Sequence, residues 1–576
     1  MAPSAATASA DALSAALPAF TRSQKVFTML GALLGLLLAA LDQTIVATAG
    51  PSIQVDLRIP ASLYAWLTTA YMVASTMMVP VWGKLSDLLG RRAVLAVGIL
   101  VFLAGSFLCG AARSTVALII FRAVQGLGSA ALFTAALAVV ADLFEPRERG
   151  KYQGLFGAVF GLSSVVGPLV GGFITDHFGW HWVFFINLPV GVVALTLVLL
   201  RMPKLRPPGV TRGGLDVRGA GSLALAVVPL LLALSLGRSG GGAWAWGSWR
   251  ILGLFALAGV GTALFLRVEL HAKEPLLDLK LFRLRAFSTA NAAVFVIGAA
   301  FLSGVVFLPL FMVNVVGLSA TRSGLTIMPL TLGVVAGNVL SGQLVAKLGR
   351  YKVLLLGSLG LLLVGFAVMG FTLTPESTQA EVTAKMVLVG LGLGPSIPLY
   401  TMAIQNAVPP QRIGVATSAA TFFRQLGMTL GVALLGTVFA ATLSRELGTR
   451  LPEATAGLPE SVRAQVAVTV PGASSEGSAP GEGFQGEAVK ARLRTEFDAE
   501  RRRVGEAQRA RVDAEEARAL EAVDRSHQAV KESFTRGVSA VYRVAILIAL
   551  LAFLVTLFLP EQPLRRGRGP EPSSVE

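Results

Sequence analysis

Cysteine and charge are both scarce in this chain of 576 residues. Cys109 is the only cysteine, which excludes an intrachain disulfide and a cysteine-based metal site. Charged residues make up 14% of the chain and apolar residues 54%, and the mean hydropathy is +0.69. A soluble domain could not bury so much apolar surface. The composition therefore predicts a polytopic membrane protein.

Motifs of catalysis and of nucleic-acid binding are missing from the sequence as well. It has no phosphate-binding GxxxxGK loop, no cluster of His, Cys or carboxylates in the apolar segments, and no cytoplasmic domain large enough for ATP hydrolysis. His177 and His181 lack a third ligand, so we expect no metal. The net charge of +16 comes without a nucleic-acid motif. We expect neither an enzyme nor a nucleic-acid partner.

Fourteen apolar stretches are each long enough to cross a bilayer. Roughly 20 apolar residues span the hydrocarbon as a helix, because a lipid-exposed backbone must satisfy its own hydrogen bonds. We therefore predict an all-α fold with fourteen transmembrane helices. The predicted spans are 26–49, 63–83, 93–111, 116–140, 153–175, 183–200, 217–236, 251–266, 288–312, 323–346, 353–373, 384–406, 413–442 and 538–559.

Lys and Arg gather on alternate loops between these spans. The loops after the second, fourth, sixth, eighth and tenth spans are rich in them, beginning with Lys84, Arg91 and Arg92, whereas most intervening loops are poor in both. Basic residues near the ends of a span resist translocation. We therefore place these loops and both termini in the cytoplasm.

One ten-residue segment recurs along the chain. Gly83-Lys-Leu-Ser-Asp-Leu-Leu-Gly-Arg-Arg92 follows the second span, and Gly342-Gln-Leu-Val-Ala-Lys-Leu-Gly-Arg-Tyr351 follows the tenth. A six-helix duplication would put the copy after the eighth span, so two helices, most simply the seventh and eighth, are inserted between two bundles. Two homologous bundles with a site between them are typical of alternating-access transporters. The predicted parts are a disordered tail (1–24), a six-helix bundle (25–202), the inserted pair (203–287), the second bundle (288–442), an outer insertion (443–537), the last helix (538–560) and a tail (561–576).

Four segments resemble the major facilitator superfamily and its fourteen-helix drug:proton antiporter branch. They are 83–92 together with Leu41-Asp-Gln-Thr-Ile-Val46, Arg122 with Gln125-Gly-Leu-Gly128, and Gly161 through Gly172; the stretch 180–189 also fits. The resemblance implies a multidrug exporter of small lipophilic compounds that works by proton antiport and alternating access. It further implies the inner (plasma) membrane of a bacterium and a proton gradient in place of a cofactor. An alternative within the same fold is the export of a lipid or an endogenous metabolite.

Asp42 is an acid in the middle of a predicted span. Intramembrane charge costs at least about 2.5–3.5 kcal/mol, so it persists mainly where it is useful or paired. Arg122 can be its partner, since each residue lies about 13–14 Å from the outer end of its helix at 1.5 Å per residue. We predict that Asp42 carries the coupled proton and that Arg122 modulates its affinity. The alternative is a buried ion pair that only fixes two helices.

Two further groups of residues have predicted roles in conformational change. In the family, the loop of 83–92 acts as a latch in which Asp87 meets a helix end or a basic residue; the alternative is ordinary topology signalling. Small residues let membrane helices pack closely and shear. For the segment from Gly161 through Gly172, the resemblance favours an antiporter hinge over generic packing. The latch residues are Gly83, Asp87, Gly90, Arg91 and Arg92, and the hinge residues are Gly161, Gly167, Pro168, Gly171 and Gly172.

Polar and aromatic residues within the spans are candidates for a substrate cavity. No second deep acid is present, which weakens the case for dicationic substrates and leaves lipophilic monocations and neutral or zwitterionic compounds open. We expect a monomer in the lipid bilayer. The cavity candidates are Gln43, Gln125, Asn291, Asn338, Tyr400, Phe423 and Arg424.

Residues 443–537 interrupt the pattern of spans on the predicted outer side. The first part is rich in Pro, Gly and Ser, whereas 488–533 lacks Pro and is dominated by Ala, Glu and Arg, which predicts a polar helix. This helix either extends the last span as a stalk or packs as a hairpin. The insertion is a candidate site for a periplasmic partner; the alternative is a tolerated variable insertion.

Overall fold

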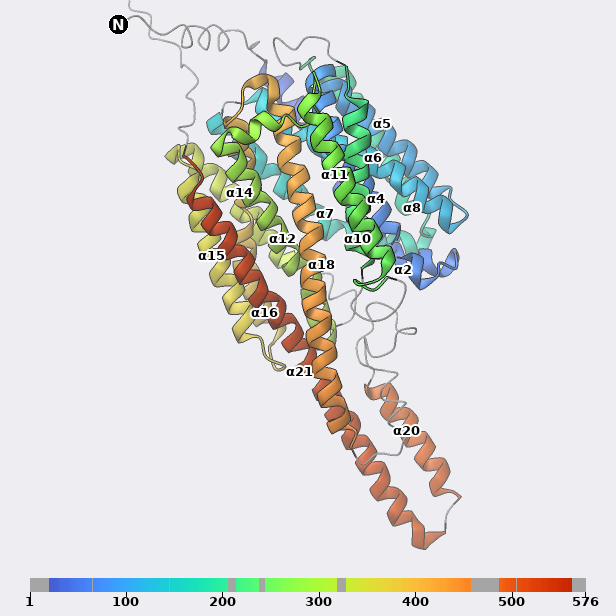
Figure 1. Cartoon of the computed structure of the whole chain (residues 1–576). Helices are drawn as coiled ribbons and strands as arrows, with labels where there is room; N and C mark the ends of the chain where they lie inside the picture. Colours follow the sequence, from blue (N-terminus) through green and yellow to red (C-terminus); the bar gives the residue numbers. More distant parts are fainter. Residues whose placement is uncertain are drawn as a thin grey trace, which may run out of the picture.

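The computed structural model describes residues 20–64, 66–144, 146–205, 214–237, 244–318, 328–456, 486–503 and 505–561. The predicted terminal tails, apart from 20–24 and 561, lie outside the described residues, as do the start of the tenth predicted span and most of the Pro- and Gly-rich stretch. The described part of the chain is helical, and each predicted span coincides with a helix or a pair of helices (Figure 1).

Two bundles form the body of the molecule, one from each half of the chain. Long apolar segments form these helices because the backbone hydrogen bonds of a helix are satisfied within the segment. In the first bundle α6 packs closely against α4 and α5, and α2 packs against α7 and α9. The N-terminal bundle contains α2 (Arg22–Asp56), α3 (Ala61–Tyr64), α4 (Trp66–Leu89), α5 (Arg91–Gly110), α6 (Thr115–Leu143), α7 (Pro146–Phe178), α8 (Trp182–Phe185) and α9 (Asn187–Arg201).

The C-terminal bundle is built around α12, α18 and α21, which all pack against one another. The last helix, α21, belongs to this bundle although a long insertion separates it from α18 in the sequence. The bundle contains η1 (Leu279–Arg283), α12 (Arg285–Asn314), α14 (Met328–Leu348), α15 (Lys352–Thr372), α16 (Gln379–Leu393), α17 (Ser396–Asn406), η2 (Pro410–Arg412), α18 (Ile413–Ala454) and α21 (Glu506–Leu557).

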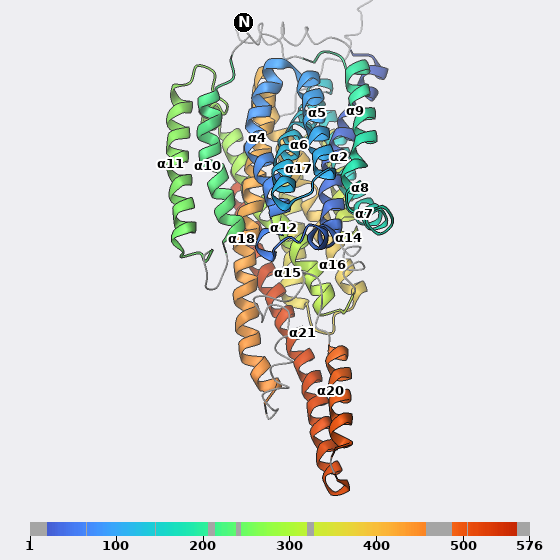
Figure 2. The same cartoon turned by 90° about the vertical axis from the view of Figure 1, so that its right-hand side faces the viewer.

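The inserted pair, α10 (Val217–Leu236) and α11 (Trp249–His271), stands beside the two bundles (Figure 2). Its two helices pack mainly against each other, and α10 also contacts α4 of one bundle and α18 of the other. The pair is therefore attached at the side of the boundary between the bundles.

Two predicted spans, 183–200 and 384–406, are each interrupted. The first is divided into α8 and α9 at Ile186, and the second into α16 and α17 at 394–395. Proline cannot donate a backbone hydrogen bond within a helix. Pro189 near the start of α9 and Pro395 between α16 and α17 place such gaps at the two breaks.

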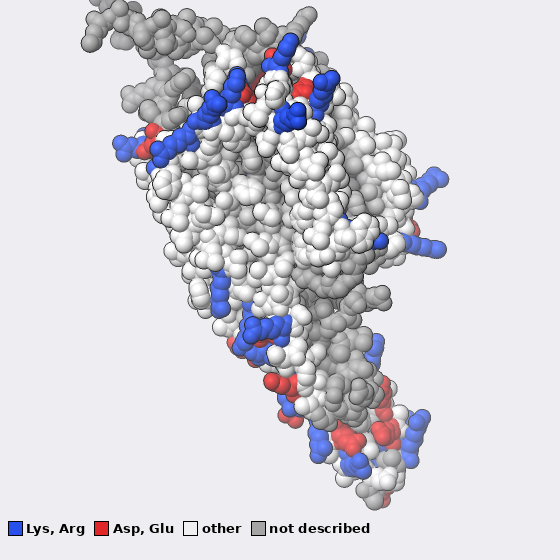
Figure 3. Space-filling view, viewed as in Figure 1, with Lys and Arg blue, Asp and Glu red and all other residues white. Residues whose placement is uncertain are grey.

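Charge is distributed as a membrane requires. Thirteen helices of the described chain are long and apolar enough to cross a bilayer; the second predicted span, α4, has 24 residues but is less apolar. In Figure 3 most charged residues gather toward the upper and lower ends, a few project at the right-hand edge, and the broad surface between them is uncharged. We call the end that carries Lys84, Arg92, Lys347 and Lys352 the basic end, and the opposite end the hairpin end.

Both described ends of the chain lie at the basic end. The Lys352 ammonium donates to the carbonyl of Leu557 at 2.8 Å, and the Tyr351 hydroxyl donates to that of Pro560 at 3.2 Å. At the other end of the chain, Lys25 lies over the ring of Phe144 near the end of α6.

The outer insertion is a projecting hairpin joined to helices that continue from the membrane body. α18 runs on to Ala454, and α21 begins at Glu506 and extends without a break to Leu557, so both predicted boundaries of the insertion fall inside helices. α20 (Gly486–Arg501) folds back along α21. The predicted polar helix is thus two helices, separated near Gly505. α21 extends the last span as a stalk, and α20 packs along it to form a hairpin.

A small apolar seam and ion pairs hold this hairpin together. Leu493 and Phe497 of α20 pack with Ala522 and Val523 of α21. The Lys490 ammonium pairs with a carboxylate oxygen of Asp524 at 2.5 Å. Hydrogen bonds to Asp524 and to Glu487 raise the pKa of Lys490 above its ordinary value.

Candidate functional sites

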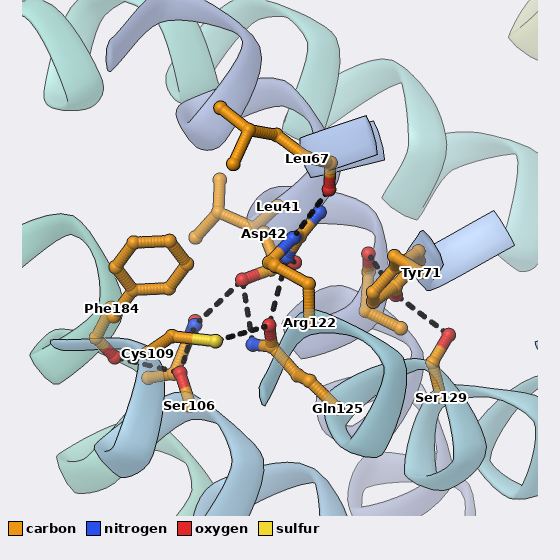
Figure 4. A network of polar contacts seen from close by, with 12 residues as sticks. Leu41, Asp42, Leu67, Tyr71, Ser106, Cys109, Arg122, Gln125, Ser129 and Phe184 are labelled. Atoms are coloured by element: carbon orange, nitrogen blue, oxygen red, sulfur yellow. Dashed lines mark hydrogen bonds and ion pairs between the residues drawn. The ribbon is translucent and has the colours of Figure 1, made fainter. Parts of the chain in front are cut away.

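The Asp42 carboxylate lies at the centre of a fully buried polar network in the N-terminal bundle (Figure 4). One oxygen, Oδ2, accepts from Nη1 of Arg122 at 2.6 Å. The other, Oδ1, accepts from the side-chain amides of Gln125 at 2.8 Å and Asn187 at 3.2 Å. The contact that equal depth permits is therefore present, and three donors from two helices, α6 and α9, converge on one acid of α2.

Arg122 has further partners besides the acid. Its Nε donates to the carbonyl of Leu67 at 3.0 Å, and its Nη1 also donates to the side-chain oxygen of Gln125 at 2.8 Å. The guanidinium carbon lies 4.4 Å from the ring centre of Tyr71, a cation–π distance. If Asp42 were neutral, the guanidinium would thus still have a carbonyl, an amide oxygen and an aromatic face.

Close helix packing makes this network possible. A Cβ on Gly105 would lie 2.6 Å from the backbone of Gln125, so α5 and α6 can meet only where one residue lacks a side chain. Gly126 plays the same part against the backbone of Tyr71 in α4. The break before α9 sets Asn187 at the start of that helix, where its amide donates to both Asp42 and Ser106.

Asp87 lies at the basic end, where it joins the two bundles. Its Oδ1 accepts from the backbone N–H of Gly414 at 3.0 Å, and its Oδ2 from that of Val415 at 2.9 Å. Gly414 and Val415 are the second and third residues of α18, whose preceding residue, Arg412, provides no side-chain cap. A carboxylate is favourable at a helix N-terminus, where N–H groups are unsatisfied and the helix dipole is positive. An acid of one bundle therefore caps a helix of the other.

Arg91 holds this capping acid in place. Its Nη1 donates to Oδ1 of Asp87 at 2.6 Å, and its Nε donates to Oδ2 of Asp142 at 2.7 Å. Asp142 lies near the end of α6. All three residues belong to the N-terminal bundle, so this ion-pair chain does not itself cross the boundary.

Gly83, Gly90 and Arg92 support the same turn in different ways. Gly90 has a φ of 92°, a backbone conformation that other residues rarely adopt. A Cβ on Gly83 would lie 2.1 Å from the hydroxyl oxygen of Ser418, so α4 meets α18 at this glycine. Arg92 instead donates to the backbone carbonyls of Leu199 and Met202 within its own bundle.

The second copy of the motif repeats the close approach but not the cap. A Cβ on Gly342 of α14 would lie 2.4 Å from the carbonyl oxygen of Gly150 in α7. The first glycine of each copy thus packs against a helix of the opposite bundle. Where Asp87 stands in the first copy the second has Ala346, which has no carboxylate to cap α7.

The predicted hinge glycines of α7 are divided between two neighbouring helices. Gly161 faces Val335 of α14, whereas Gly167 and Gly171 face Thr44 and Ile45 of α2. Gly172 has open space beside it. The partner helix changes between Gly161 and Gly167, so one half of α7 packs on the opposite bundle and the other half on its own. Pro168 lies inside α7 within the half that faces α2.

Another contact between the bundles was not expected from the sequence. The side-chain amide of Gln153 in α7 donates to that of Gln405 in α17 at 3.2 Å. Gln405 in turn donates to the hydroxyl of Thr417 in α18 at 2.9 Å. Both glutamines are buried, so this polar bridge is shielded from water.

The candidate cavity residues do not form one group. Gln125 belongs to the Asp42 network, while the neighbouring Gln43 is exposed. The hydroxyl of Tyr400 is bonded to that of Thr556 in α21, so this ring is part of the packing inside the C-terminal bundle rather than a cavity wall.

The other four candidates lie closer to the boundary or to a pocket. Asn338 is buried where α14 meets Gly157 of α7. Asn291 donates to the carbonyl of Phe287 in its own helix. The ring of Phe423 packs edge-on against Phe282, and Arg424 lines a pocket between α12, α17 and α18.

Sequence reasoning missed Asn187 and Ser106 in the acid network and the N-terminus of α18 as the partner of Asp87. Asn187 carries a signal in hindsight, since it is an amide in an otherwise apolar span. Among the described residues no group of three or more His, Cys, Asp and Glu side chains gathers as a metal site would require.

Comparisons with known proteins agree with the fold. A profile of the Major Facilitator Superfamily matches residues 32–432. The multidrug transporter protein MdtP of Bacillus subtilis (strain 168) is 40% identical over 420 residues, which cover 73% of this chain and 76% of that protein. The tetracenomycin C resistance and export protein of Streptomyces glaucescens is 33% identical over 456 residues, which cover 79% and 82%.

Two solved structures share the fold at low sequence identity. The crystal structure of the human organic anion transporter MFSD10 has a TM-score of 0.54 and 17% identity, and covers 73% of this chain and 94% of its own. The proton:xylose symporter XylE has a TM-score of 0.52 and 16% identity, and covers 74% and 91%.

Proposed function

We propose that this chain, which belongs to the Major Facilitator Superfamily and is a transporter rather than an enzyme, exports small lipophilic compounds from a bacterial cell by proton antiport. Relatives named for multidrug transport and for tetracenomycin C resistance and export support the export of drug-like compounds. In this proposal the protein lies in the plasma membrane with its basic end toward the cytoplasm.

The contacts between the bundles support alternating access. At the basic end Asp87 caps α18, Gly342 packs on Gly150, and Gln153 meets Gln405. The principal contacts of α2 are with helices of its own bundle, and those of α12 are with helices of the C-terminal bundle. The structure is therefore closed at the basic end, and in our proposal this is the state that opens outward.

The Asp42 network supports the proton-coupling role, and it is the single observation on which the proposal rests most. A carboxylate with three donors is favoured in its charged form, whereas removal from water favours the neutral form. Small movements of α9 or α6 would change the number of donors and hence the proton affinity of Asp42. Arg122 keeps other partners when the acid is neutral, so protonation does not leave a stranded guanidinium.

The proposed cycle follows from this balance. Asp42 takes up a proton while the site is open to the outside, and the neutral acid then favours rotation toward the cytoplasm. Substrate bound from the inner side competes with that proton, which is released. Protons move down their gradient and the compound moves out.

Everted membrane vesicles test the proposal. In vesicles from cells that express the protein, respiration acidifies the lumen, and a quenched acridine dye reports this acidification. We expect tetracenomycin C to release part of the quench in the absence of ATP, and vesicles without the protein to show no release. A compound-dependent transport that requires added ATP, with no movement of protons, would refute antiport.

A further inference from the structure

The C-terminal bundle contains a partly buried cation with no hydrogen-bond or ion-pair partner among the described residues. Arg424 lies in α18 and lines a narrow pocket with Thr401 and Ser396 of α17 and Val294 and Phe301 of α12. None of the hydrogen bonds and ion pairs between described residues involves its guanidinium, whereas Arg91 and Arg122 each have several partners. Both hydroxyls in the pocket donate to backbone carbonyls of their own segment.

The position of Arg424 makes this lack of a partner unusual. It is 11 residues from the start of α18, or roughly 16 Å along a helix that must cross about 30 Å of hydrocarbon. A charged side chain at that depth is expected to face a cavity and to have a counter-ion.

No described acid is free to act as that counter-ion. Asp42 is the acid nearest the middle of a span, and its two oxygens are already occupied by Arg122, Gln125 and Asn187. Others such as Asp87 and Glu269 lie within the last turn of their helices. The described part of the chain therefore offers Arg424 no counter-ion.

The pocket lies on the side of the bundle that transport requires. Of its three helices, α17 also contacts α7, and α18 also contacts α4 and α6 of the opposite bundle. The pocket is narrow, walled mainly by apolar side chains, and too small to hold a whole lipophilic molecule. Since Arg424 is only partly buried, an anionic group can reach its guanidinium from the open side of the pocket. Phe423 and Phe282 provide an aromatic surface close by on the same bundle.

We propose that Arg424 binds an anionic group of the exported compound, so that lipophilic acids such as carboxylates and ionised phenols are a preferred substrate class. This inference rests on the proposed export function and names the substrate class for it. A guanidinium can form two parallel hydrogen bonds to a carboxylate, which gives both affinity and orientation. The anion supplies the counter-charge that α18 lacks.

Binding to the purified protein in nanodiscs tests the proposal. The two probes are 4-(1-pyrenyl)butyrate and 4-(1-pyrenyl)butanol, which share a fluorophore and differ in charge. We expect the wild type to bind the acid about tenfold or more tightly than the alcohol at neutral pH, as a charge-assisted pair should. Arg424→Gln should bring the ratio close to one while the affinity for the alcohol changes little.

Two more variants keep the test decisive. Arg424→Lys retains the charge and should retain part of the preference, even if Arg424→Gln does not fold. Arg543→Gln is the matched control, because Arg543 of α21 lies outside the pocket and donates to the carbonyl of Gly370. It should leave the ratio unchanged.

Equal binding of the two probes by the wild type, or an acid preference that survives in Arg424→Gln, would overturn the assignment. The measurement uses no proton gradient, so its outcome is separate from that of the antiport test. Loss of proton coupling with an intact acid preference would reject the proposed antiport and keep Arg424 as an anion site.

Discussion

Asp87→Ala should shift the protein away from the state that is closed at the basic end. The variant removes the acceptor for the backbone N–H groups of Gly414 and Val415, which join the two bundles at 3.0 and 2.9 Å. The pair between Asp87 and Arg91 lies inside one bundle. It is expected to persist in every state, so its loss does not bias the equilibrium between states.

The size of the shift follows from the two bonds that cross the boundary. Hydrogen bonds to a charged group contribute about 1.5–3 kcal/mol each, and a helix cap is worth about 0.5–2 kcal/mol in measured substitutions. Water replaces the lost partners when the bundles separate, so a net bias of about 1–3 kcal/mol is expected. This corresponds to roughly a 5- to 150-fold change in the ratio of the two states.

Distances between spin labels at the basic end can measure this ratio. Leu89 at the end of α4 and Leu348 at the end of α14 are both exposed and belong to opposite bundles. With Cys109 replaced by Ala, cysteines at these two positions carry the only labels. We expect a second, longer distance to become populated in Asp87→Ala and to remain minor in the parent protein.

Asp216→Ala is the matched control for this experiment. Asp216 also caps a helix, since its Oδ1 accepts from the backbone N–H of Gly219 at 2.9 Å, but both residues lie in the inserted pair. The distance distribution should not change in this variant. If Asp87→Ala gave the parent distribution as well, the cap would not be a latch and the reasoning would be wrong.

Two further predictions concern the glycines of the repeated motif. Gly342→Val should also favour the longer distance between the labels, because its side chain would collide with the backbone of Gly150 in α7; an unchanged distribution would show that this contact is not required for closure. Gly90→Ala should lower the thermal unfolding midpoint of the purified protein, since a non-glycine residue at a φ of 92° and a ψ of 155° costs about 1–3 kcal/mol; an unchanged midpoint, measured beside Gly357→Ala in open space on α15, would contradict this.

Hydropathy was sufficient to predict the helices because the bilayer imposes one strong rule on the backbone. Each predicted span coincides with a helix or an interrupted helix, and depth alone was enough to pair Asp42 with Arg122. The ends of helices were less predictable. α2 continues through Pro51 to Asp56, and the Trp180 indole donates to the Asp56 carboxylate. No local sequence pattern predicts this contact.

Sequence pattern and spacing could not predict contacts between residues that are distant in the sequence. Asp87 was expected to meet a helix end, but which helix depends on how the two bundles dock. The start of α18 carries a weak clue, because Arg412 precedes it where Ser, Thr, Asp or Asn would usually cap a helix. The stripe of glycines in α7 was treated as one interface, although its contacts belong to two different helices.

Polarity alone was a poor guide to the cavity. Tyr400 and Gln125 are both polar residues in predicted spans. The Tyr400 hydroxyl is nevertheless bonded within the C-terminal bundle, and the Gln125 amide belongs to the Asp42 network. Whether a buried polar group has a partner decides what it can do, and only the three-dimensional arrangement reveals that. Arg424 stands out from the other candidates for this reason.

In the proposed mechanism Asp42 carries the transported proton, and this role can be measured as proton flux in proteoliposomes. The wild type, Asp42→Asn and Asp42→Glu are reconstituted at equal protein levels, and a trapped pH dye follows protons when a compound that releases the quench in everted vesicles is added on one side. We predict coupled flux in the wild type, partial flux in Asp42→Glu and none in Asp42→Asn. Undiminished compound-driven proton flux in Asp42→Asn would contradict the account and leave Asp42 and Arg122 as a purely structural ion pair.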